Sequence, residues 1–137
     1  MKIIILNEDQ VQNYQLQLRH VNISVRSPGA PLIKLSRNIW RQDTLFLQFH
    51  DIDGPIDNLA AVPFSREQAQ QIIDFFSHWR LIVDTFVINC EAGISRSSAI
   101  GAALCKIAGE DDSLFFKQYI PNRYVYRTIL EEYGKEG

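Results

Sequence analysis

The segment from Thr85 to Ala108 constrains the fold of this chain more than any other part of the sequence. It begins with the apolar run TFVIN, continues through a loop that contains Gly93, and ends in the small-residue run SSAIGAALCKIA. A short run rich in β-branched residues is typical of a buried strand, and a helix of small residues can pack closely on a sheet. The segment therefore predicts a strand, a tight loop and a helix, which is the repeating unit of parallel α/β folds.

Further strands and helices are predicted on both sides of this unit. Ser65 opens the clearest helix, because Ser65 to Gln68 matches a capping box and apolar residues then recur at helical spacing to about Arg80. Strands are expected over 2–6, 21–25 and 45–49, a weak surface helix or a loop over 8–18, and a last helix after Asn122. We expect a single α/β domain over residues 1–137, with a central, mostly parallel sheet flanked by helices.

Composition restricts the partners of such a domain. The chain has 137 residues, 46% of them hydrophobic and 22% charged, as in globular proteins. A net charge of -2 gives no overall attraction to nucleic acid or to an anionic membrane, so neither is expected as a partner. Two cysteines form neither a disulfide framework nor a zinc pattern, and the apolar run at the N-terminus is too short for a signal peptide. We expect a cytoplasmic protein without metal or cofactor.

The loop from Cys90 to Arg96 carries the chemistry of the predicted unit. Open α/β sheets bind ligands at the carboxyl edge, where this loop would lie. The helix that begins near Ser97 directs unpaired N–H groups and the positive end of its dipole into the loop, and Gly93 lets the backbone curl so that successive amides converge. The natural ligand of such a loop is an anion of the size of phosphate, such as phosphate, vanadate or sulfate.

Three side chains in this segment predict a nucleophile for phosphorus. Arg96 has a planar fork of donors that fits two oxygens of a phosphoryl group. Cys90 would lie at the base of the loop, where a helix N-terminus and an arginine favour the thiolate, and the Ser97 hydroxyl could donate a hydrogen bond to it. The alternative is a buried structural cysteine with an unconnected surface arginine.

The run CEAGISRS resembles the signature loop of cysteine-based protein tyrosine phosphatases, in which five residues separate the cysteine from an arginine followed by Ser or Thr. The likeness extends from about Leu45 to the C-terminus and is greatest to the compact, dual-specificity branch. It implies a protein tyrosine phosphatase-like fold, a metal-free reaction through a cysteinyl-phosphate intermediate, Cys90 as nucleophile and Ser97 as its hydrogen-bond partner. It also implies a phosphate-binding loop formed by Glu91, Ala92, Gly93, Ile94, Ser95 and Arg96. Asn89 departs from the family pattern, which usually has a histidine that helps to hold the loop and activate the thiol.

The reaction needs an acid to protonate the leaving oxygen. A strand over 45–49 parallel to 85–89 would bring the aspartates that follow it, Asp51, Asp53 and Asp57, to the edge where Cys90 lies. Asp51 matches the general acid of the family best, and Asp53 is the alternative. The aspartates can also act simply as turn caps.

The predicted function is hydrolysis of phosphomonoesters, in phosphorylated proteins or in small molecules. Glu91 in the loop argues against a polyanionic substrate, since it repels additional phosphates. Two alternatives remain: a phosphate-binding module with little turnover, and a rhodanese-like sulfurtransferase, which also gathers amides around a cysteine. The closing Arg-Ser pair and the upstream aspartates fit phosphate chemistry better than sulfur transfer.

Overall fold

Four parallel strands form one sheet in the computed structural model, which describes residues 1–54 and 60–135. The strands are β1 (Lys2–Leu6), β2 (His20–Arg26), β3 (Arg41–Gln48) and β4 (Thr85–Asn89), and their order in space is β1-β4-β2-β3. Each neighbouring pair is parallel, so the carboxyl ends of the four strands lie at one edge. This confirms the predicted α/β class, with β4 in the interior of the sheet.

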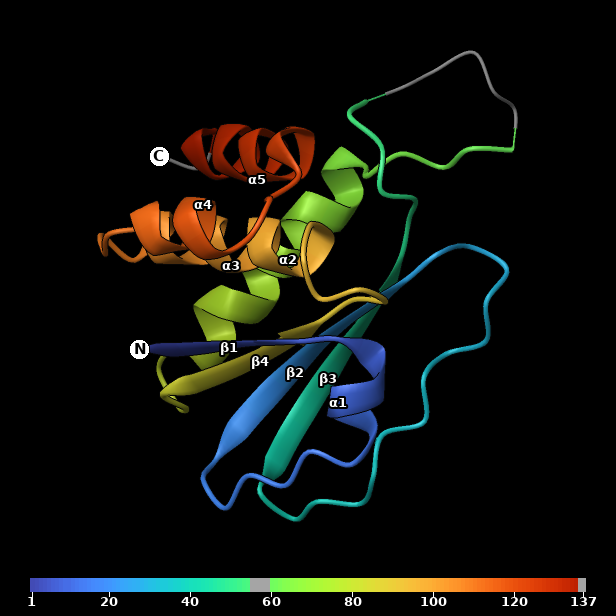
Figure 1. Cartoon of the computed structure of the whole chain (residues 1–137). Coiled ribbons are helices and arrows are strands. Elements are labelled where there is room, and N and C mark those ends of the chain that lie inside the picture. Colours follow the sequence, from blue (N-terminus) through green and yellow to red (C-terminus); the bar gives the residue numbers. More distant parts are fainter. Residues whose placement is uncertain (55–59, 136–137) are drawn as a thin grey trace.

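The helices lie on both faces of the sheet (Figure 1). One face is covered by α2 (Arg66–Trp79), α3 (Arg96–Ile107), α4 (Ser113–Gln118) and α5 (Arg123–Gly134), and α1 (Glu8–Gln12) lies on the other. Ser65 caps α2 in the predicted capping box with Gln68, and Asn122 caps α5 by accepting from the Val125 amide. No helix of the described residues is both long and apolar enough to cross a membrane.

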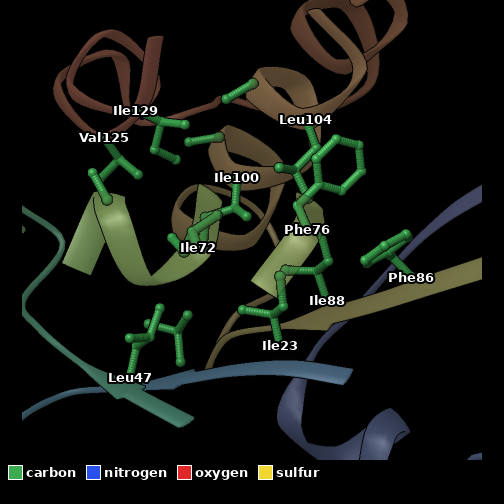
Figure 2. Packing of buried hydrophobic residues seen from close by; sticks show 14 of the residues in the cluster. Ile23, Leu47, Ile72, Phe76, Phe86, Ile88, Ile100, Leu104, Val125 and Ile129 are labelled. Carbon is green, nitrogen blue, oxygen red and sulfur yellow. The ribbon is translucent and has the colours of Figure 1, made fainter. Parts of the chain in front are cut away.

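The main core lies between the sheet and helices α2, α3 and α5 (Figure 2). Ile23 of β2 and Ile88 of β4 are register partners, and both are fully buried against Phe76 of α2 and Ile100 of α3. Alternate residues of the strands point to the opposite face. There, a smaller cluster forms under α1 and the loop before β3, from Leu6, Val11, Ile33 and Val87.

Two predicted elements have different limits in the structure. Over 8–18 the sequence predicts a weak surface helix or a loop, and the structure has both: α1 ends at Gln12 after one short turn, which Asn7 and Gln10 cap and which buries only Val11. The chain then continues as a loop in which Tyr14 and Leu16 pack on the smaller cluster. Strand β3 begins at Arg41, four residues before the predicted strand, since it is an edge strand whose first residues are polar and largely exposed.

Candidate functional site

The loop between β4 and α3 lies at the carboxyl edge of the sheet, as expected from the sequence. Gly93 in this loop has a φ of +69°, and a Cβ at this position would lie 2.7 Å from the backbone nitrogen of Asn7. The Glu8 amide donates to the Glu91 carbonyl at 3.3 Å. Only glycine allows this loop to pack directly on the backbone that follows β1, because both the backbone conformation and the space exclude a side chain.

Cys90 is buried directly after β4, with 2% of its surface exposed. Its sulfur accepts a hydrogen bond from the Gly93 amide at 3.3 Å, and the Ser97 hydroxyl oxygen lies 3.1 Å away. The contact between Cys90 and Ser97 that the sequence predicted is therefore present. A backbone amide and a hydroxyl thus lie within hydrogen-bond distance of this one sulfur.

The second thiol, Cys105, lies in a different environment. It is buried near the end of α3, and burial, with Glu110 and Asp112 nearby, raises its pKa to about 11. Cys105 therefore remains a neutral thiol at physiological pH. Both cysteines are free thiols in the structure.

Arg96 is the first residue of α3, and 6% of its surface is exposed. Its Nη1 donates to the Phe49 carbonyl at 2.8 Å and to the Ser27 hydroxyl at 3.2 Å. Its Nη2 pairs with a Glu91 carboxylate oxygen at 3.1 Å. Its Nε is buried and makes no hydrogen bond to the described residues. Three segments of the chain thus hold the guanidinium in place. These contacts use three of its five N–H donors, so one on Nη2 and the one on Nε remain for a ligand.

Glu91 links Arg96 to the loop after β2. One carboxylate oxygen accepts from the Ser27 amide at 2.8 Å and from the Ser27 hydroxyl at 2.6 Å, in addition to the Arg96 contact. These hydrogen bonds from Ser27, followed by the Arg96 guanidinium, hold the pKa of the Glu91 carboxyl below its usual value. The sequence does not predict the role of Ser27. It lies in a Ser-Pro-Gly turn far from Glu91 in the chain, and no local pattern connects the two residues.

The aspartates after β3 differ in their surroundings. The Asp51 side chain accepts from the Ser95 hydroxyl at 2.9 Å and from the Asn122 amide nitrogen at 2.8 Å, so it adjoins the loop of Cys90. Asp53 instead lines a pocket of about 430 Å³ beside the start of α5. Asp57 lies outside the described residues. The geometry therefore brings Asp51 to the candidate site.

The remaining residues of the loop form its rim and its base. Ala92 and Ile94 are exposed and Ser95 is half-buried. Asn89 is fully buried, and its side-chain amide makes no hydrogen bond to the described residues. Within residues 1–54 and 60–135 no group of three His, Cys, Asp or Glu side chains could hold a metal ion.

Comparison with known proteins finds likeness in structure only. No model of a protein family matches the sequence, and no curated protein matches it. Among solved structures, the human tyrosine phosphatase-like serine/threonine/tyrosine-interacting protein is similar, with a TM-score of 0.66 and 17% identity over 98% of this chain and 92% of the other. Human DUSP28 has a TM-score of 0.60 and 12% identity, over 95% and 90% of the two chains.

PTPMT1 in complex with PI(5)P is also similar, with a TM-score of 0.59 and 15% identity over 99% of this chain and 95% of that one. At these identities the likeness establishes the fold. The chain therefore has the protein tyrosine phosphatase-like fold, as the sequence predicted.

Proposed function

We propose that this protein is a metal-free phosphomonoesterase that acts through a cysteinyl-phosphate intermediate, as a protein tyrosine or dual-specificity phosphatase over residues 1–137. One observation carries the proposal: a buried thiol with two potential donors and a buried arginine with a free Nε occupy one loop at the start of a helix. Such a loop can bind a dianionic phosphoryl group and present a nucleophile to it.

The proposed reaction has two steps. In the first, the Cys90 thiolate attacks phosphorus, an S–P bond forms, the P–O bond to the leaving group breaks, and Asp51 donates a proton to the leaving oxygen. In the second, water attacks phosphorus, Asp51 accepts its proton, the S–P bond breaks and inorganic phosphate leaves. The Arg96 donors that remain, on Nε and Nη2, and the loop amides of Glu91 to Arg96 stabilise the charge on the phosphoryl oxygens. Ser97 donates to the departing thiolate.

A singly phosphorylated substrate fits this site best. The Glu91 carboxylate is charged at neutral pH and partly exposed, so it repels any further phosphate at the rim of the loop. We therefore propose a phosphorylated protein or a small phosphomonoester as the substrate, with phosphate, vanadate or sulfate as competing ligands. We also propose a reducing compartment, the cytoplasm, because the mechanism requires a free Cys90 thiol.

The test is turnover of p-nitrophenyl phosphate with a chelator present. We expect wild-type turnover that vanadate inhibits, and we expect Cys90→Ser to abolish turnover while it still binds phosphate. Cys105→Ser is the matched control and should remain active, because Cys105 lies near the C-terminal end of α3 and the loop lies at the N-terminal end. A folded wild-type protein without turnover between pH 5 and 7 would contradict the enzyme proposal.

A phosphate-binding module is the second candidate. It is supported by the likeness to a tyrosine phosphatase-like interacting protein and by the buried Asn89 amide, which has no hydrogen-bond partner among the described residues. In that case wild-type protein and Cys90→Ser would bind a phosphopeptide equally, and neither would release phosphate. A sulfurtransferase would form thiocyanate from thiosulfate and cyanide, and neither of the other two candidates would, so this assay distinguishes it from both.

A further inference from the structure

Asn122 connects three parts of the candidate site. It lies directly before α5, and 5% of its surface is exposed. Its side-chain Nδ2 donates to Asp51 Oδ1 at 2.8 Å and to the Ile52 carbonyl at 3.0 Å. Its backbone amide donates to the Ser95 carbonyl at 3.0 Å. One residue thus joins the segment that carries Asp51, the loop that carries Cys90 and the start of α5.

The orientation of the Asn122 amide group is fixed from within the helix. Its Oδ1 accepts from the Val125 amide at 3.0 Å, as expected of a helix N-cap, so its NH₂ group must point away from α5. The NH₂ group therefore faces Asp51 and Ile52. The asparagine amide carries its acceptor and its donors on separate atoms, so it can accept from the helix and donate to a carboxylate beyond it at the same time.

From these contacts we propose that Asn122 is a positioning residue for the general acid. The proposal rests on the proposed phosphatase function. Asp51 lies on an exposed segment after β3. It accepts one hydrogen bond from the loop, from the Ser95 hydroxyl, and one from the Asn122 side chain, whose backbone amide is bonded to the loop. Of these two, only Asn122 is also bonded to the backbone of the acid's own segment, through Ile52. It holds the Asp51 carboxyl at the distance from the loop at which a leaving oxygen can be protonated.

A positioned acid has a specific kinetic signature. It matters most for substrates whose leaving group is a strong base, since these need a proton in order to depart. Phenyl phosphate has such a leaving group, a phenol like that of tyrosine with a pKa of about 10. The leaving group of p-nitrophenyl phosphate is much more acidic. The ratio of kcat/KM on the two substrates therefore reports the position of the acid rather than the general integrity of the site.

Asn122→Ser tests the proposal, because serine is an equally good N-cap but is too short to reach Asp51. We expect the variant to lose about tenfold more kcat/KM on phenyl phosphate than on p-nitrophenyl phosphate, a part of the roughly 10² to 10⁴-fold that a general acid contributes. Asn122→Asp, also a good cap, should behave in the same way, since a carboxylate cannot donate to Asp51.

Asp51→Asn and Asp53→Asn are the reference variants. We expect Asp51→Asn to lose much more kcat/KM on phenyl phosphate than on p-nitrophenyl phosphate. Asp53→Asn should keep the ratio of the two values near that of wild type. Combining Asp51→Asn with Asn122→Ser should change the ratio no further, because the acid that Asn122 positions is already absent.

Each outcome has a distinct meaning. The inference is overturned if Asn122→Ser and Asn122→Asp lose kcat/KM equally on both substrates, or if the effect of Asn122→Ser adds to that of Asp51→Asn. Asn122 would then be a structural cap only, and the phosphatase function would stand. A wild-type leaving-group ratio in Asp51→Asn removes the acid assignment and the inference with it. Absence of wild-type turnover contradicts the proposed function itself.

Discussion

Glu91 is an acidic side chain in the loop between β4 and α3, and its local contacts favour its charged form. Its carboxylate accepts two hydrogen bonds from Ser27 and one from Arg96, and one carboxylate oxygen takes part in all three. The carboxylate reduces the positive charge of the loop. It also contacts Nη2 of Arg96, whose Nε makes no hydrogen bond within the part of the chain that the structure describes. Glu91 thus makes a structural contact, and under the proposed function it would also limit the charge of the substrate.

Glu91→Gln should remove part of the pH dependence of stability. Because the pKa of Glu91 is lowered in the folded protein, chiefly by Ser27, its ionisation stabilises the fold above the ordinary glutamate pKa of about 4.3. This contribution is lost as the pH falls through the lowered pKa. We expect wild type to unfold at higher urea than Glu91→Gln near neutral pH, and the two midpoints to converge in acid.

Ser27→Ala is the companion variant, since it removes the hydroxyl that contributes most to the lowered pKa. It should shift the acid loss of stability to higher pH, while the Ser27 amide contact remains. Parallel curves for wild type and Glu91→Gln over the whole pH range would show that the carboxylate contributes nothing in its charged form.

At the scale of elements, the site depends on how closely the loop after β4 packs on the end of β1. Gly93→Ala places a methyl group against the backbone of Leu6 and Asn7 and also requires a left-handed conformation. Gly109→Ala is the matched control, because Gly109 also has a positive φ, +77°, but has nothing within 4 Å of an added Cβ. We expect both variants to lose stability and only Gly93→Ala to lose vanadate affinity, by more than tenfold, as measured by inhibition.

Equal vanadate affinity in the two glycine variants would mean that the loop can move off β1 without losing its shape. Backbone strain from the left-handed conformation would then explain the lost stability by itself, since an alanine at positive φ destabilises wherever it lies.

The elements that the sequence predicted well are those with local signals. Helices α2 and α5 begin with recognisable caps, and β4 and α3 are marked by their apolar and small residues. The first half of β3 could not be found, because polar residues such as Arg41 and Gln42 are tolerated on an edge strand. Helix α4 was not predicted either, since it has only six residues and buries none of them fully.

The same distinction applies to the candidate site. The contact between Cys90 and Ser97 lies within one loop, so its spacing in the sequence predicts it. The contacts of Arg96 with Ser27 and Phe49 join segments far apart in the chain, and no local pattern indicates them. Asn122 was recognisable as a helix cap but not as a partner of Asp51, because only the fold brings the two together.

For the molecule as a whole, the candidate site is where separate segments of the chain meet. Arg96 is bonded to the loop after β2 and to the end of β3, Gly93 rests on the end of β1, and Asn122 connects the loop to α5. An anion in the loop would hold these segments together by its bonds to Arg96 and the amides. Ligand binding should therefore stabilise the whole fold and not only the loop.

Inorganic phosphate should accordingly raise the melting temperature. A ligand at about 100 times its Kd stabilises the folded state by about 2.7 kcal/mol, which corresponds to roughly 5 to 10 °C for a domain of this size. Arg96→Lys keeps the positive charge but loses the fork, so its shift should be much smaller. Sodium chloride at equal ionic strength controls for salt. Phosphate also stabilises proteins by exclusion from their surfaces, so an equal shift in wild type and Arg96→Lys would locate the effect outside the loop.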